Sequence, residues 1–310
     1  MAKIHSIEEI YQIITALPPK KIAVANAQDA HVLEAVEEAR QAGYATAFLV
    51  GDPEKIAEVA GEEGIDLSNY DVCPAYTDLE ALELATRLVR DLKADVLMKG
   101  KLQSADFFRA ILNKEYGLRD NDAVLSILSL IDLKKRNQLT FLIDAALNPL
   151  PNLEMKQEFI EMSVSVLKMM GIQKPKVAVL SAAEKVNTKM ASSVEAEELA
   201  RRNREGIIRD CIVEGPLSFD LAMSKEAVAV KGYQGKIEGD ADLIVVPSLE
   251  AGNMLYKSLI LYTEMETAAI MLGTKAPVVF SSRADSASTK KNTIATAIYL
   301  AEAKKQNACE

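Results

Sequence analysis

Short apolar runs alternate with amphipathic stretches along the whole chain of 310 residues, and this alternation constrains the fold more than any other feature. Stretches such as HVLEAVEEARQAG and LEALELATRLVRDL carry apolar residues three and four positions apart, as amphipathic helices do. Alternating strands and helices are typical of βαβ units and a mostly parallel sheet. The predicted strands are 21–27, 44–51, 94–100, 139–146, 176–183, 207–215, 242–248 and 276–282, with a weaker strand near Tyr70–Cys73.

The length and the local signals predict how the chain is divided. A chain of 310 residues suits two α/β domains. The segment DAALNPLPN, residues 144–152, is the clearest loop, because its two prolines interrupt any regular element. Ser192–Ser193–Val194–Glu195 has the form of a capping box that opens the helix EAEELARRNR.

Composition excludes several classes of function. The formal charge of −9 and the pI near 5.1 argue against nucleic-acid binding, which requires a basic surface. The N-terminal sequence is no signal peptide and no stretch is long and apolar enough to span a membrane, so we expect a cytoplasmic protein. The three scattered cysteines indicate reduced thiols. Because the chain has only two histidines, His5 and His31, we expect no metal site.

Polar and small residues follow most of the predicted strands. In parallel sheets, ligands bind beyond the carboxyl ends of the strands, where loops and helix N-termini direct N–H groups. Several of these ends fit an anionic ligand, although loops after strands are polar in any case. The segments are ANAQDA, MKGKLQSAD, DAALNP, SAAEKVN, PSLEAGN and SSRADS.

Three motifs are candidates for an anion site. In APVVFSSRADS, residues 276–286, Arg283 can offer a bidentate fork to phosphate, or else pair with Asp285 on the surface, before a helix that starts near Ser286 or Ser288. MKGKLQSADFFRA places Lys99 and Lys101 around Gly100, followed by Ser104 at a predicted N-cap and then Arg109; the alternative is a pair of solvated lysines. PSLEAGNMLYK places Gly252 and Asn253 in a turn before a helix that bears Lys257, which also suits an ordinary turn.

Several familiar signatures are missing from the sequence. It has no GxGxxG dinucleotide fingerprint, no GxxxxGK[ST] phosphate loop and no GxSxG nucleophile elbow. The tetrad Ser288–Thr289–Lys290–Lys291 matches S-x-x-K, a pattern short enough to occur by chance.

Taken together, the motifs resemble the phosphate acetyl/butyryltransferase family, and they look closer to its butyryltransferase branch. The similar segments run in the family's order from ADVLMKGKLQSADFFR through TFLIDAALNPLP, KVAVLSAAEKVNTKM and EGPLSFDLAMS. They continue through GDADLIVVPSLEAGNMLYKSL to APVVFSSRADS, and so cover about the last two-thirds of the chain.

The resemblance implies an architecture shared with isocitrate and isopropylmalate dehydrogenases, with a cleft between two α/β domains. The expected domains are residues 1–120 with 276–310, and residues 121–275. It also implies a homodimer and the reversible reaction acyl-CoA + phosphate ⇌ acyl phosphate + CoA, with coenzyme A as a substrate and no other cofactor.

The resemblance also implies roles for particular residues. The family's Ser–Arg pair matches Ser282 and Arg283, and its helix arginine, expected to face that pair, matches Arg109. The acetyl branch has an aspartate where this chain has Thr289, so Asp285 is only a loose substitute. The predicted substrate- and CoA-binding residues are Lys99, Gly100, Lys101, Ser104, Gly252, Asn253 and Lys257.

Such a site would act by positioning two polyanions and offsetting their charge. Arg283 and Arg109 would clamp the phosphoryl group, and Ser282 would donate a hydrogen bond in a direct ternary-complex transfer, because no matched histidine is present to activate it as a nucleophile. Three alternatives remain: an acyltransferase using acyl carrier protein, a metal- and NAD-dependent dehydrogenase of the same architecture, and a silent CoA-binding module.

Overall fold

The computed structural model describes residues 2–280 and 286–308, which form two compact units. The terminal unit comprises Ile7–Ala123 and Ala268–Glu310, and the central unit comprises Met1–Ser6 and Val124–Thr267. Both units are mixed α/β structures with mostly parallel strands, which confirms the predicted fold class. The domain boundaries that the resemblance implies, after residue 120 and before residue 276, stay a prediction.

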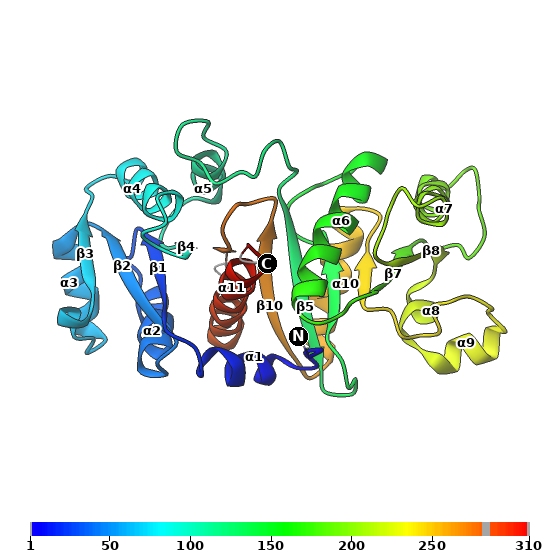
Figure 1. Ribbon diagram of the computed structural model, residues 1–310, viewed down its shortest axis with the longest axis horizontal. Helices are drawn as coiled ribbons and strands as arrows, with labels where there is room; N and C mark the ends of the chain where they lie inside the picture. Colours follow the sequence, from blue (N-terminus) through cyan, green and yellow to red (C-terminus); the bar gives the residue numbers. More distant parts are fainter. Residues whose placement is uncertain (1, 281–285, 309–310) are drawn as a thin grey trace. The chain divides into compact units, whose positions relative to one another are not determined.

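The sheet of the terminal unit has the strand order β3-β2-β1-β4-β11-β10 (Figure 1). Its members are parallel except β10, which runs antiparallel to β11 and carries the chain from the central unit into this one. The strands are β1 (Lys20–Ala25), β2 (Ala45–Gly51), β3 (Asp71–Pro74), β4 (Val96–Lys99), β10 (Met265–Leu272) and β11 (Val278–Val279).

Helices cover this sheet because their apolar positions recur with helical spacing. In α4, Thr77 and Glu80 form a capping box at the N-terminus, and Ala81, Leu82, Ala85, Leu88 and Val89 are buried. The last helix, α11, packs against α1 and α2, as the red and blue helices of Figure 1 show. The helices are α1 (Ile7–Ile14), α2 (Ala30–Gln41), α3 (Pro53–Glu62), η1 (Leu67–Asn69), α4 (Asp78–Arg90), α5 (Ser104–Ile111) and α11 (Ala287–Ala308).

The sheet of the central unit has the strand order β5-β6-β9-β7-β8. β5 and β6 pair antiparallel, and the remaining neighbours pair parallel. The strands are β5 (Ser126–Leu133), β6 (Thr140–Ile143), β7 (Lys176–Leu180), β8 (Ile212–Leu217) and β9 (Leu243–Val245). The helices are α6 (Leu153–Met169), α7 (Ala191–Arg204), α8 (Phe219–Met223), α9 (Lys225–Lys231) and α10 (Leu249–Tyr262).

Two strands and several helix starts, among them that of α7, differ from the sequence prediction. β5 and β10 were not predicted, since a short apolar run without regular alternation does not distinguish a buried strand from a helix. The predicted capping box at Ser192 is wrong, because the N-cap of α7 is Met190, two residues earlier. Ser193 lies inside that first turn, where its hydroxyl donates to Asn187 O and Met190 O at 2.9 and 2.8 Å.

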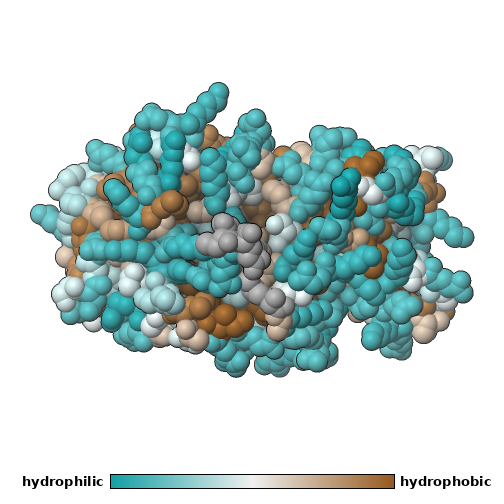
Figure 2. All heavy atoms as spheres, in the orientation of Figure 1, coloured by the Kyte–Doolittle hydropathy of each residue, from teal (hydrophilic) through white to brown (hydrophobic). Residues whose placement is uncertain are grey.

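The loop predicted at residues 144–152 is confirmed, since the chain is irregular from Asp144 until α6 begins after its cap Asn152. No helix in the described part of the chain is long and apolar enough to cross a membrane. Figure 2 shows that hydrophilic residues cover most of one face, interrupted by separate apolar areas.

Candidate functional site

The loop after β4 is held tightly against the end of β1. Ala25 and Lys99 are partners in register on these two parallel strands, so the residues that follow them remain adjacent. Gly100 N donates to Ala25 O at 2.9 Å, and Lys101 N donates to Asn26 O at 3.0 Å. A Cβ atom on Gly100 would lie 2.0 Å from Asn26 O, so only glycine fits here without moving the backbone.

Asn26 supports this loop from the β1 side. It adopts a left-handed conformation with φ of 58°, which asparagine tolerates better than most residues, and it is buried. Its side-chain amide Nδ2 donates to Asp78 Oδ1 at 2.7 Å, at the start of α4. The strands and the helix are therefore tied together at their shared edge.

A cavity of about 490 Å³ opens at this edge, beyond the carboxyl ends of β1 and β4. It contains three lysines and two aspartates, together with backbone of the tightly held loop. Asp29 is partly committed to structure, since Oδ1 accepts from Val32 N at the N-terminus of α2. The lining residues are Asp29, His31, Val32, Asp78, Lys99, Gly100, Lys101, Leu102, Gln103 and Lys290.

The predicted residues Lys99, Gly100 and Lys101 all line this cavity. Lys99 is buried, with 7% of its surface exposed, and its Nζ lies 3.4 Å from Gly100 O. Lys101 is exposed. The location matches the expectation that ligands bind where neighbouring parallel strands end and their following helices diverge.

Ser104 and Arg109 lie on α5 and are not among the residues that line the cavity. The predicted N-cap at Ser104 is wrong, since Gln103 occupies that position without a side-chain hydrogen bond and Ser104 is the first helical residue. The Arg109 side chain is 75% exposed and forms an ion pair with Asp106, one turn earlier. Its guanidinium is thus accessible but already has a carboxylate partner.

Phe280 links α5 to the end of the last strand. Its ring packs against the rings of Phe107 and Phe108, with centroids 6.1 and 5.1 Å apart. Ser282, Arg283 and Asp285, three of the four predicted catalytic residues, lie outside the described residues. Phe280, the last described residue before them, thus packs against the helix that carries Arg109.

The predicted start of the last helix is confirmed. α11 begins at Ala287, and Ser286 Oγ accepts from Thr289 N at 3.1 Å. Thr289, which stands at the spacing of the acetyl branch's aspartate, is buried and its hydroxyl lies 3.0 Å from Ser286 Oγ. This position therefore contributes to capping the helix.

Gly252, Asn253 and Lys257 all lie within α10 of the central unit. The turn predicted at Gly252 and Asn253 is therefore wrong, because the helix already begins at Leu249, after its cap Ser248. A Cβ on Gly252 would lie 2.7 Å from Val246 Cγ2 and 3.1 Å from Asp144 O, so the glycine permits close contact between α10 and the ends of β6 and β9. Asn253 Nδ2 donates to Ala145 O at 3.2 Å, and Lys257 is exposed.

A buried carboxylate organises the loop at this place. Asp144 accepts from Ala146 N at 2.9 Å, from Leu147 N at 3.1 Å and from both the backbone and the side chain of Asn148. Burial nevertheless raises the pKa of Asp144 above its ordinary value. The carboxylate is therefore occupied by its own loop.

The sequence prediction missed four residues of the terminal unit. Asn26 lies at the end of the predicted strand 21–27, and Asp29 and Asp78 follow predicted strands, but nothing in their spacing shows which loops meet. Lys290 belongs to the S-x-x-K tetrad and reaches the cavity from α11, a helix far away in sequence. No group of three or more His, Cys, Asp or Glu side chains suited to a metal ion occurs among the residues that the structure describes.

Comparisons with known proteins identify the family of this chain. The phosphate acetyl/butaryl transferase family model matches residues 75–298. The chain is 41% identical over 298 residues to phosphate butyryltransferase of Clostridium acetobutylicum, covering 96% of this chain and 99% of that one. It is 38% identical to phosphate acetyltransferase of Thermotoga maritima, covering 91% and 95%.

Solved structures show the same relationship. The crystal structure of a branched-chain phosphotransacylase from Enterococcus faecalis matches with a TM-score of 0.82 and 31% identity, covering 91% of this chain and 99% of that one. A 4-hydroxythreonine-4-phosphate dehydrogenase from Klebsiella pneumoniae matches with a TM-score of 0.55 and 12% identity, which shows a dehydrogenase-like fold alone. The chain belongs to the phosphate acetyl/butyryltransferase family of acyltransferases.

Proposed function

We propose that this protein reversibly transfers a short acyl group, butyryl or similar, between coenzyme A and inorganic phosphate, with an acyl phosphate as the second product. Membership of the family, with 41% identity to a phosphate butyryltransferase over nearly the full length of both chains, carries the proposal. The lysine-lined cavity beyond β1 and β4 supports it, because both substrates are polyanions and the protein as a whole is acidic.

The transfer proceeds in a ternary complex, without an acyl-enzyme. Arg283 and Arg109 hold the phosphoryl group and offset the charge that develops during attack on the thioester. Ser282 donates a hydrogen bond to the thioester oxygen or to the departing sulfur. Asp285 is the remaining candidate for the family's aspartate, since Thr289 occupies that spacing.

The same proposal assigns substrate and CoA binding to Lys99, Gly100, Lys101, Ser104, Gly252, Asn253 and Lys257. Coenzyme A is a substrate, and no further cofactor is part of the reaction. The protein acts in the cytoplasm as a homodimer, which light scattering during size-exclusion chromatography tests by giving a mass near twice the 33.8 kDa of one chain.

A thiol-release assay tests the function. Purified protein is mixed with phosphate and with acetyl-, propionyl-, butyryl- or isobutyryl-CoA, and the free CoA thiol is measured with DTNB. We expect release that depends on phosphate and needs no added metal or NAD. Full activity without phosphate would indicate a thioesterase and contradict the proposal.

Two substitutions and one mass measurement test the mechanism. Arg283→Ala removes a charge-assisted phosphate contact worth roughly 1.5–3 kcal/mol, so turnover and phosphate affinity both decrease, and Arg283→Lys restores only part. Ser282→Ala should lower kcat with little change in the KM for phosphate. An acyl adduct on Ser282, found by intact-mass measurement after incubation with acyl-CoA alone, would replace the ternary complex with a covalent route.

A further inference from the structure

Lys290 is a buried cation that is not one of the proposed catalytic residues and has no side-chain role in the described part of α11. It lies near the start of α11, and only 8% of its surface is exposed. Within residues 2–280 and 286–308, its ammonium group forms no ion pair or hydrogen bond. A buried charge is costly unless something pairs with it, so this ammonium group is suited to a partner from outside the described residues.

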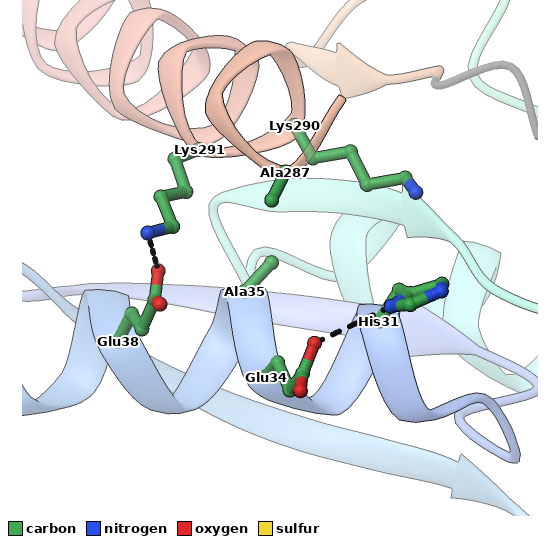
Figure 3. Close-up of a pocket in the computed structure, with 7 residues that line it drawn as sticks. All are labelled: His31, Glu34, Ala35, Glu38, Ala287, Lys290 and Lys291. Carbon is green, nitrogen blue, oxygen red and sulfur yellow. Dashed lines mark hydrogen bonds and ion pairs between the residues drawn. The ribbon is translucent and has the colours of Figure 1, made fainter. Parts of the chain in front are cut away.

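The neighbouring lysine shows what an ordinary contact on this helix looks like. Lys291 forms an ion pair with Glu38 of α2. In Figure 3 the Lys290 side chain extends in the other direction, toward the end of α2 that carries His31, and no interaction is drawn to it. The nearby Glu34 carboxylate lies 3.3 Å from His31 Nδ1. The two adjacent lysines thus have different surroundings on the same helix.

Lys290 lines two adjoining hollows of the terminal unit. One is the cavity of about 490 Å³ that it shares with Lys99 and Lys101. The other, of about 160 Å³, lies between α2 and α11 and is the one drawn in Figure 3. Lys99, which is equally buried and whose Nζ contacts Gly100 O, also lines the larger cavity, so two lysines border the same space.

The carboxylates of the larger cavity do not supply the missing partner. Asp29 accepts from Val32 N at 3.1 Å, and Asp78 accepts from Asn26 Nδ2 at 2.7 Å. Neither lies within ion-pair distance of Lys290. Both acids therefore stabilise the loops that frame the cavity.

We propose that Lys290 binds a phosphate group of a substrate in the cavity beyond β1 and β4, together with Lys99. This rests on the proposed function for the identity of the ligand, since both inorganic phosphate and the phosphates of coenzyme A have the required chemistry. Buried ammonium groups suit such a ligand, because charge-assisted hydrogen bonds to phosphate are stronger away from water.

The test compares Lys290→Met, which keeps the length of the side chain and removes its charge, with Lys291→Ala, which removes the neighbouring half-buried lysine that pairs with Glu38. Without ligand, Lys290→Met should unfold at the same temperature as the unaltered protein or higher, because the unpaired charge is gone. With inorganic phosphate or CoA as separate probes, the increase in Tm should be smaller for Lys290→Met and unchanged for Lys291→Ala. Lys290→Gln repeats the test if Lys290→Met does not fold.

Kinetics then identify the phosphate that Lys290 holds. The KM for phosphate should increase about 10- to 100-fold if Lys290 binds inorganic phosphate. The KM for acyl-CoA should increase by a similar factor if Lys290 binds a phosphate of CoA, and dephospho-CoA as a thermal-shift probe separates the 3′-phosphate from the pyrophosphate. Either result supports the proposal.

Unchanged KM values together with unchanged ligand-induced Tm increases in the Lys290 variants would overturn it. The thermal measurements need no turnover, so they also separate the two proposals. A protein that releases no thiol from any acyl-CoA, yet shows a phosphate-induced Tm increase that depends on Lys290, would reject the acyl-transfer function and retain the phosphate site.

Discussion

In both units a glycine packs closely against the end of a neighbouring parallel strand, but the polar residues around the two glycines differ. Gly100 packs against Asn26 in the terminal unit, and Gly252 packs against Val246 and the Asp144 loop in the central unit. In the central unit, Asp144 and Asn253 both direct their polar groups to the loop that follows β6. In the terminal unit, lysines instead face a cavity.

This difference separates polar residues that build a loop from polar residues available to a ligand. Asp144 has backbone and side-chain donors around both of its oxygens, so its carboxylate is fully used in hydrogen bonds that hold its own loop. The Lys290 ammonium group has no such partner among the described residues. We therefore expect substitutions at the Asp144 loop to alter stability first, and substitutions of the cavity lysines to alter ligand binding first.

The largest expected effect comes from Gly100→Ala. A Cβ there would lie 2.0 Å from Asn26 O and 2.6 Å from Ala25 O, and backbone cannot yield as a flexible side chain does. We expect the free energy of unfolding to decrease on the order of 3–5 kcal/mol, with loss of activity, as measured by urea denaturation and thiol release. The control Gly61→Ala meets no atom within 4 Å in α3 and should be neutral or slightly stabilising. Equal behaviour of the two variants would contradict the tight β1–β4 junction.

Gly252→Ala should have a smaller effect. The closest atom to the new Cβ is the side-chain atom Val246 Cγ2 at 2.7 Å, and the backbone neighbours are 3.1 Å away. Partial repacking limits the cost to about 1–3 kcal/mol in urea denaturation. A loss larger than that of Gly100→Ala would reverse the ranking of the two junctions.

Asp144→Asn should change how stability depends on pH. Because burial raises the Asp144 pKa, the folded chain retains this proton at pH values where the unfolded chain has lost it. The contribution of this group to stability is therefore greatest at acid pH and decreases as the pH increases from about 4 through the raised folded pKa. The amide does not titrate, so this decrease should be absent from unfolding free energies measured across that range.

At neutral pH, Asp144→Asn should also cost about 1 kcal/mol, because the new amide N–H faces the donors of Asn148. Asp66→Asn is a control with the opposite pH dependence. Hydrogen bonds from Ser68 lower the Asp66 pKa, so the contribution of Asp66 to stability is lost as the pH decreases. Identical pH slopes for Asp144→Asn and the unaltered protein would show that Asp144 titrates normally.

The smallest effect is expected for Lys257→Ala. This lysine is exposed on α10, so stability should remain within about 0.5 kcal/mol. If it contacts CoA from the surface, the KM for acyl-CoA should increase about two- to fivefold, measured beside the exposed control Lys225→Ala. An unchanged KM would remove Lys257 from the CoA-binding set and leave the central unit's junction without a cationic ligand contact.

Much of the fold could be predicted from local patterns. The strands around Ile22, Leu49, Leu97 and Ile244 were identified, since each is a short apolar run followed by a polar loop. β5 and β10 were missed, and both belong to antiparallel pairs that the βαβ pattern does not predict. The helix starts at Ser104 and Ser192 were misplaced by one position or more, because residues with good capping side chains also occur inside first turns.

The sequence by itself determined the α/β class, the family and the candidate loops, because strand patterns, composition and short motifs are local properties of the chain. Only the tertiary structure decided which loops meet. Gly100 touches Asn26 because β1 and β4 are neighbours in the sheet, although more than 70 residues separate them in sequence. Lys290 reaches the same cavity because α11 packs against α2, and no spacing rule connects residues so far apart.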